Sequence, residues 1–205
     1  MINRKRLPLI IVLALLIVLG LGVYFVVHNN IHHEQNSASI SSVATPKMAV
    51  KRNKILIIYY SNSGNTQNAA ERIQKQTKSH IVEMSITPTY PNNYSKLTSV
   101  VKKQFDNNTR PKINNVPNLA KYNIILLGFP TWFHRPPMLI NTFFETTNLR
   151  GKTVIPFTTS ADSPISDSTP YLKRMARGTG VKLQEGFRAN NISVINKYVK
   201  RHKLV

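Results

Sequence analysis

Five short apolar runs, separated by segments with helical periodicity, dominate the chain from residue 54 onward. The runs are residues 54–60, 80–86, 123–129, 152–160 and 181–189. The helical segments between and after them are residues 65–77, 94–105, 137–147, 169–177 and 194–201. A short continuous apolar run is typical of a strand that is buried on both faces, as in a parallel sheet. The alternation therefore predicts an α/β domain with a doubly wound, five-stranded parallel sheet and helices on both faces.

The first loop after a predicted strand is rich in hydroxyl and amide groups. The stretch "YYSNSGNT", residues 59–66, contains Ser61, Ser63 and Thr66, and Gly64 permits a tight turn before the next helix. In such sheets ligands bind outside the carboxyl ends of the strands, and the N–H groups at a helix N-terminus favour a phosphate. The loop lacks the Gly-x-x-x-x-Gly-Lys sequence of nucleoside-triphosphate sites. It predicts either a phosphate cradle or an ordinary helix cap, since Ser and Asn are also preferred cap residues.

Two further loops directly follow predicted strands. The stretch "GFPTWFHRPP", residues 128–137, places the single tryptophan of the chain, Trp132, beside Phe133 and His134. These aromatic side chains either contact a flat ring or close the core beneath the loop. The stretch "FTTSADSP", residues 157–164, is polar. Together, a phosphate cradle, an aromatic loop and a polar loop predict a pocket for a flat ring with a phosphate tail.

Composition limits the classes of function. The chain has 28 Lys and Arg residues against 8 Asp and Glu residues, a formal net charge of +20. This charge predicts association with something anionic, and nucleic acid, an anionic membrane, a cell-wall surface and acidic protein partners all qualify on charge alone. No basic helix or aromatic-studded sheet motif accompanies it, so we expect no specific binding of nucleic acid. The absence of cysteine excludes disulfides, thiolate catalysis and cysteine-ligated metal centres.

The N-terminal segment predicts a membrane anchor. Residues 7–27 carry no charge, and at about 1.5 Å per residue such a helix crosses the roughly 30 Å hydrocarbon core. The run is longer than the apolar core of a cleaved signal peptide, and Arg4, Lys5 and Arg6 precede it and should stay inside. We predict a cytoplasmic basic segment (residues 1–6), a single transmembrane helix (7–28), a flexible extracytoplasmic linker (29–51) and the α/β domain (52–205).

Several of these motifs together resemble the flavodoxin-like family. The stretch "YYSNSGNT" matches the family's phosphate loop, in which Ser or Thr occupies the first, third and sixth positions and Gly the fourth. Residues 89–94, 109–113, 128–137 and 151–159 resemble, in order and spacing, the branch that is common in Gram-positive bacteria. The resemblance extends over about residues 54–200. One departure is the third loop, where "SADSP" stands in place of the glycine-rich sequence that relatives in this branch often have. This sequence allows the loop backbone fewer conformations than a glycine-rich one.

The resemblance implies FMN as the cofactor and assigns roles to residues. It implies that the phosphate is held by Ser61, Ser63, Gly64, Asn65 and Thr66. It implies that the flavin ring is lined on one side by Pro130, Thr131, Trp132 and Phe133, with His134 as the candidate proton donor, and on the other side by Thr159, Ser160 and Ala161. We expect no catalytic side chain and no metal, because the chemistry of such a protein resides in its flavin.

The sequence thus predicts a membrane-anchored, extracytoplasmic flavodoxin-like protein that binds FMN and transfers electrons to or from a redox partner protein or a quinone-type acceptor. Two alternatives remain open. One is an FMN-dependent reductase of quinones or similar small acceptors. The other is a flavin-free binding module with the same fold at the cell surface.

Overall fold

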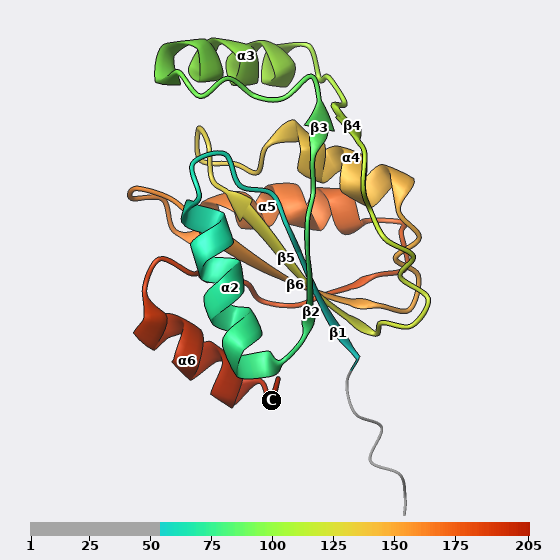
Figure 1. The fold of residues 1–205 in the computed structure, drawn as a ribbon. Coiled ribbons are helices and arrows are strands. Elements are labelled where there is room, and N and C mark those ends of the chain that lie inside the picture. Colours follow the sequence, from blue (N-terminus) through green and yellow to red (C-terminus); the bar gives the residue numbers. More distant parts are fainter. Residues whose placement is uncertain (1–53) are drawn as a thin grey trace, which may run out of the picture. The chain divides into compact units, whose positions relative to one another are not determined.

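The computed structural model describes residues 54–205, and these residues form a parallel sheet with the strand order β2–β1–β5–β6–β7, in which β8 also pairs with β6 (Figure 1). Its strands are β1 (Ile55–Tyr59), β2 (His80–Glu83), β5 (Ile124–Pro130), β6 (Thr153–Thr159), β7 (Lys182–Leu183) and β8 (Phe187–Arg188). Every pairing in this sheet is parallel. The winding direction reverses between β1 and β5, which is where open α/β sheets bind ligands.

Helices cover both faces of the sheet, as predicted. Those on the two faces are α2 (Asn65–Thr77), α4 (Met138–Thr146), α5 (Ile165–Ala176) and α6 (Ile192–Arg201), and a fifth helix, α3 (Tyr94–Asp106), lies elsewhere. Alternate side chains of a strand point to opposite faces. Leu56 and Ile58 of β1 belong to a buried cluster with side chains of α4 and α5, whereas Ile55 and Ile57 belong to a second cluster with side chains of α2 and α6.

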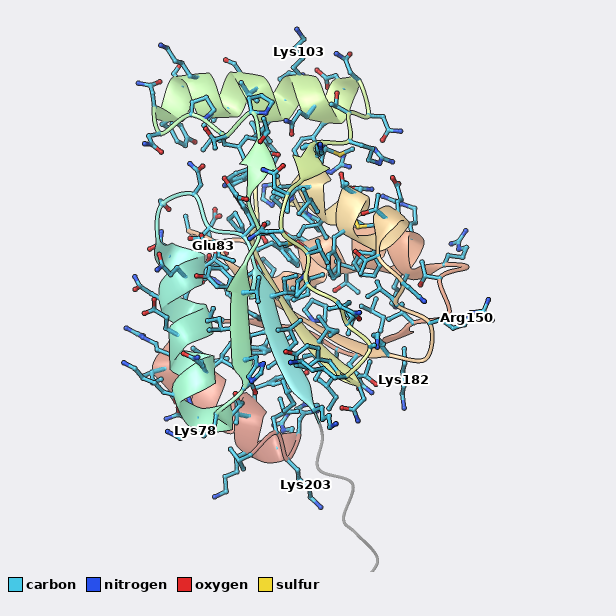
Figure 2. The ribbon with its side chains drawn as sticks, turned by 45° about the vertical axis from the view of Figure 1, so that its right-hand side comes forward. Lys78, Glu83, Lys103, Arg150, Lys182 and Lys203 are labelled. Carbon is cyan, nitrogen blue, oxygen red and sulfur yellow. The ribbon has the colours of Figure 1, made fainter. Side chains whose placement is uncertain are left out.

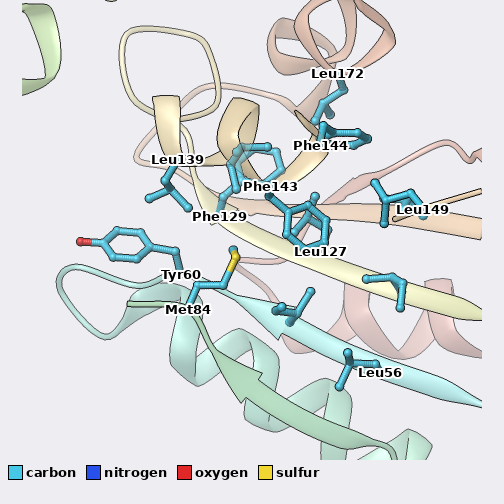
Figure 3. Close-up of a cluster of buried hydrophobic side chains, with 14 of the residues drawn as sticks. Leu56, Tyr60, Met84, Leu127, Phe129, Leu139, Phe143, Phe144, Leu149 and Leu172 are labelled. Carbon is cyan, nitrogen blue, oxygen red and sulfur yellow. The ribbon is translucent and has the colours of Figure 1, made fainter. Parts of the chain in front are cut away.

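The first of these clusters supports the carboxyl end of β5. Figure 3 shows Phe129 of β5 packed among Phe143 and Phe144 of α4 and neighbouring leucines. Phe129 and Phe143 are 0% exposed and Phe144 is 2% exposed. Truncating such a side chain to Ala typically costs about 3–5 kcal/mol. The loop that follows β5 therefore starts from a rigid base.

The predicted fifth strand, residues 181–189, is divided into two short strands on the same side of β6. Three steps along β6, from Val154 to Phe157, correspond to four steps from Leu183 to Phe187, so one extra residue interrupts the pairing. Pro156 lies opposite this interruption and has no N–H group to donate. A side chain at Gly186 would lie 2.6 Å from the Pro156 carbonyl oxygen, so only glycine fits there.

The predicted strand over residues 80–86 also ends early. Its partner β1 ends at Tyr59, which pairs with Glu83. The chain then forms a separate antiparallel pair, β3 (Ile86–Thr87) with β4 (Lys112–Ile113), which the sequence did not predict. This pair flanks α3 in the chain, and Figure 1 shows α3 beyond the carboxyl ends of the main strands. Helix α5 begins at Ile165, four residues before its predicted start at residue 169.

No helix within residues 54–205 is both long enough and apolar enough to cross a membrane. The predicted anchor and linker, residues 7–28 and 29–51, lie outside the described residues.

Candidate functional site

The loops after β1, β5 and β6 meet at the carboxyl ends of their strands and enclose a cavity of about 730 Å³, here called the strand-end cavity. Of the residues assigned from the sequence, those that line it are Ser63, Asn65, Thr66, Pro130, Thr131, Trp132, Phe133, His134, Thr159, Ser160 and Ala161. Ser61 and Gly64 belong to the same loop as Ser63 but are not among the lining residues. Its volume is typical of a site for a small organic ligand.

The N-terminus of α2 opens onto this cavity without a side-chain cap. Gly64 is its N-cap residue and has a left-handed φ of 81°. A Cβ atom placed there would meet nothing within 4 Å, so the requirement for glycine is conformational. By contrast, the side chains of Asn93 and Asn191 cap α3 and α6. The first N–H groups of α2 have no intrahelical partner and are available to an anion.

A buried hydroxyl without a partner lies in the same loop. The Oγ atom of Ser61 is buried and has no hydrogen-bond partner among residues 54–205. Such a group costs about 1–3 kcal/mol in lost hydration, so its presence points to a partner that the protein alone does not supply. Thr66 differs, because its Oγ1 lies 2.8 Å from Oγ1 of Thr159 and thereby joins the first loop to the third.

The sequence left open whether the aromatic residues after β5 line a ligand site or close the core, and the structure shows that Trp132 does both. Trp132 is half-buried and packs edge-on against Tyr60 and Tyr90, with ring centroids 6.2 and 5.0 Å apart. It therefore closes the core and also lines the cavity. Phe133 is instead 52% exposed at the mouth of the cavity. Burial raises the pKa values of Tyr60 and Tyr90 well above the ordinary value, so both rings are neutral.

The tip of this loop is a strained turn. Trp132 and Arg135 exchange backbone hydrogen bonds of 3.0 and 3.1 Å, and the two residues between them, Phe133 and His134, have φ values of 48° and 60°. Asn and Gly usually occupy such positions, and bulky residues there cost on the order of 1 kcal/mol or more each. Strain of this kind is concentrated at functional sites.

His134 is held by side chains that precede or begin α5. Its Nδ1 atom lies 2.9 Å from a carboxylate oxygen of Asp167 and 3.2 Å from the hydroxyl of Ser163. Both contacts use the same ring nitrogen, so these three residues cannot form a nucleophilic triad, which needs both nitrogens. The arrangement leaves Nε2 of this exposed ring as the atom that could exchange a proton with a ligand.

The third loop is fixed by two residues that the sequence analysis did not select. The guanidinium of Arg188 donates to the carbonyl oxygens of Ser160 and Ala161 at 3.1 and 2.6 Å. The side chain of Asn190 donates to the same Ser160 oxygen at 2.6 Å and accepts from the Ser160 N–H at 3.2 Å. These bonds hold the backbone of the third loop in place. Their sequence signal is weak, because both residues lie at or after the end of a short edge strand.

Helix α3 contributes a further wall that sequence reasoning missed. Its Tyr94, Leu97 and Val101 line the strand-end cavity, and Tyr94 is 79% exposed. The helical periodicity of residues 94–105 predicted one of the helices that cover the sheet. Their position beyond the strand ends depends instead on the β3–β4 pair.

The strand-end cavity is nearly neutral although the chain is strongly basic. Apart from His134, its charged lining residues within the described part of the chain are Arg72 and Asp162. A ligand held here is therefore bound by hydroxyls, amides, N–H groups and aromatic rings. This donor set suits a flat ring with a phosphate tail.

Comparison with known proteins assigns the family. Residues 54–201 match the family model described as flavodoxin, and a comparison with curated proteins found no significant match.

Three solved structures support this match. A Bacteroides eggerthii protein considered to be a flavoprotein is 30% identical, with a TM-score of 0.63 over 72% of this chain and 96% of that one. A Bacteroides uniformis protein of the same description is 29% identical, with a TM-score of 0.62 over 73% and 99%. A Lactobacillus acidophilus flavoprotein solved in complex with FMN is 27% identical, with a TM-score of 0.62 over 71% and 98%. This chain belongs to the flavodoxin family.

Proposed function

We propose that this chain binds FMN in the strand-end cavity and transfers electrons as a membrane-anchored, extracytoplasmic flavodoxin. The observation that carries the proposal is the buried, unpartnered hydroxyl of Ser61 beside the uncapped N-terminus of α2. A phosphate accepts hydrogen bonds from both. The FMN complex of the Lactobacillus acidophilus relative supports the choice of ligand.

Different residues of the chain would bind the phosphate and the ring of FMN. Ser61, Ser63 and the first N–H groups of α2 would hold the phosphate, and Gly64 sets the backbone turn at the start of this helix. Trp132 and Phe133, together with the third loop, line the rest of the cavity and would contact the ring. When bound, FMN supplies one- and two-electron redox chemistry. The protein contributes the position of the ring and of the phosphate.

The anchor and the partners are part of the proposal and rest on the sequence. An uncharged run at residues 7–28 follows three basic residues, which favours a single transmembrane helix with the domain outside. The net charge of +20 favours an anionic membrane or cell-wall surface. A redox partner protein or a quinone-type acceptor would then meet the flavin at this surface.

Titration of the purified full-length chain with FMN, followed by flavin fluorescence, tests the cofactor assignment, and riboflavin is the matched control because it lacks only the phosphate. Two hydrogen bonds to a charged phosphate at about 1.5 kcal/mol each predict at least ~100-fold tighter binding of FMN. Equal affinities would remove the phosphate cradle from the proposal. A chain that binds neither flavin would instead be a flavin-free binding module.

A second candidate function, reduction of quinones or similar small acceptors, is favoured by the contact between His134 and Asp167. An electron carrier needs no proton donor fixed beside the flavin, whereas a reductase of small acceptors benefits from one. Steady-state turnover of a soluble quinone by the FMN-loaded protein distinguishes the two. Turnover that falls in His134→Gln while FMN affinity is unchanged would favour the reductase.

A further inference from the structure

A second cavity, of about 830 Å³, lies between α4, α5 and the segment around residues 108–110. It shares no lining residue with the strand-end cavity. We name it the arginine cleft, because its lining includes Arg110, Arg135, Arg150, Arg174 and Arg177. Figure 2 shows Arg150 projecting from the side of the domain away from α2. The strand-end cavity is nearly neutral and this cleft is strongly basic, so we expect the two to bind different ligands.

One carboxylate lines the arginine cleft, and it is already paired. Glu145 accepts two hydrogen bonds, of 2.7 and 2.9 Å, from Nε of Arg110. Within residues 54–205, the other four lining guanidinium groups form no ion pair with a carboxylate. The cleft thus concentrates about four uncompensated positive charges, which repel one another unless an anion joins them.

Two of the guanidinium groups in the arginine cleft stack on aromatic rings. The guanidinium of Arg135 lies over the rings of Phe105 and Tyr171, 4.2 and 4.4 Å from their centroids. Arg174 lies 4.6 Å from the centroid of the same Tyr171 ring. Stacked guanidinium groups lose less freedom when they bind a ligand, so these two arginines are preorganised donors.

Two buried polar atoms of the lining residues also lack partners. Nε of Arg135 and Oδ1 of Asn141 are buried and have no hydrogen-bond partner among the described residues. Burial lowers the pKa of Arg135, as do the neighbouring charges of Arg174 and Arg110, while Tyr171 raises it. The unpartnered Nε of Arg135 and the repulsion from neighbouring arginines disfavour the free protein, and a bound anion relieves both. Oδ1 of Asn141 is an acceptor and requires a donor instead, such as a hydroxyl group of the ligand.

We propose that the arginine cleft binds a small molecule that carries at least two phosphate groups. Guanidinium forks match the geometry of phosphate oxygens, and two phosphates supply about three to four negative charges near neutral pH, which matches the four unpaired arginines. The concave shape and the volume of about 830 Å³ suit a compact ligand rather than a polymer.

The arginine cleft also adjoins the aromatic loop after β5, because Arg135 belongs to both. Arg135 closes the strained turn whose other members, Trp132, Phe133 and His134, line the strand-end cavity. The ring of Phe133 packs edge-on against Phe105, the ring that Arg135 stacks upon, with centroids 6.1 Å apart. A phosphate ligand in the cleft therefore binds directly behind the loop that bounds the first site.

Isothermal titration of the full-length chain with inorganic pyrophosphate, at fixed ionic strength and with saturating FMN, tests this site. Saturation with FMN keeps pyrophosphate out of the phosphate cradle of the first cavity. Arg174→Gln and Arg177→Gln should each weaken pyrophosphate binding by about ten-fold or more, because each removes charge-assisted hydrogen bonds. Lys173→Gln is the matched control, since it removes one positive charge from α5, beside Arg174, at a residue that does not line the cleft. It should change the affinity less than about two-fold.

Citrate in place of pyrophosphate separates phosphate recognition from a general preference for small polyanions, and pyrophosphate should bind more tightly. The proposal is overturned by equal weakening in all three variants, which would mark the net charge of the domain as the cause. It is also overturned if millimolar pyrophosphate does not bind, or if only long polyanions bind. Should the chain bind no FMN, the same titration still tests the cleft, because binding at the first cavity would not respond to Arg174→Gln.

Discussion

At the scale of single residues, Ser61 is the clearest link between structure and function. Its hydroxyl is buried without a partner in the described part of the chain, while the neighbouring Thr66 is paired with Thr159. A paired hydroxyl stabilises the fold by itself, whereas an unpaired one stabilises the fold only with a ligand. Ser61 and Thr66 both carry a hydroxyl, but that of Thr66 stabilises the fold without a ligand and that of Ser61 does not.

We expect Ser61→Ala to weaken FMN binding by about ten-fold, because one hydrogen bond to a charged phosphate is lost. The melting temperature of the flavin-free protein should stay the same or rise slightly, because an unsatisfied polar group has been removed. Flavin fluorescence and thermal unfolding measure the two effects. Ser99→Ala is the control, since Ser99 is exposed on α3 and lines neither cavity. A fall in melting temperature without flavin would show that Ser61 has a structural partner instead.

At the scale of elements, the helices differ in how they begin. Asn residues cap α3 and α6, α4 and α5 follow prolines, and α2 follows a left-handed glycine with no capping side chain. An uncapped N-terminus carries free N–H groups and the positive end of the helix dipole. At the reversal point of the sheet, the proposed phosphate would supply hydrogen-bond partners for this end of α2.

Hydrogen exchange with and without FMN measures this effect. We expect FMN to slow the exchange of the amides in the first turn of α2, residues 65–67, because a phosphate becomes their partner. The first turn of α6 provides an internal control, as Asn191 already accepts from the Ser193 N–H at 2.7 Å. Protection that is equal at both helices would indicate general stiffening of the domain, and no protection at α2 would place the phosphate elsewhere.

At the scale of the whole molecule, charge is distributed unevenly. The chain has a formal charge of +20, yet the strand-end cavity is lined by one arginine and one aspartate, and the arginine cleft by five arginines and one glutamate. The positive field of such a protein attracts anionic surfaces within about a Debye length, roughly 8–10 Å at physiological salt. Under the proposed function, flavin binding would depend on the residues that line the strand-end cavity, whereas association with an anionic surface would depend on the net charge of the domain.

The proposed topology places the whole charged domain outside the membrane. Protease added to intact protoplasts should therefore remove residues 54–205 and leave a short membrane-bound fragment, because the basic residues before the apolar run stay inside. Antibody against the domain and mass spectrometry of the membrane fraction read out the cleavage, and an intact cytoplasmic protein serves as the control for leakage. A domain that is digested only after lysis would reverse the orientation.

The sequence by itself determined the alternation of the main strands with helices and the three loops at the strand ends. These features are local: apolar runs such as residues 123–129 specify a buried strand, and parallel connection then brings the carboxyl ends of the strands to one edge. For that reason the loops after the predicted strands are expected at one edge of the sheet, and the resemblance to flavodoxins assigns individual residues within them. Ser63, Thr131 and Ser160, which are far apart in the chain, line the strand-end cavity.

Only the tertiary structure decided the features that depend on distant contacts. The break between β7 and β8 arises because Gly186 meets Pro156 of another strand, and the third loop is fixed by Arg188 from a neighbouring one. Likewise, Arg135, Arg150 and Arg174 form one cleft because the fold brings the ends of α4 and α5 together. Hydrophobic periodicity indicates which face of a helix or strand is buried. It does not indicate which polar side chains of other helices or strands will contact that element.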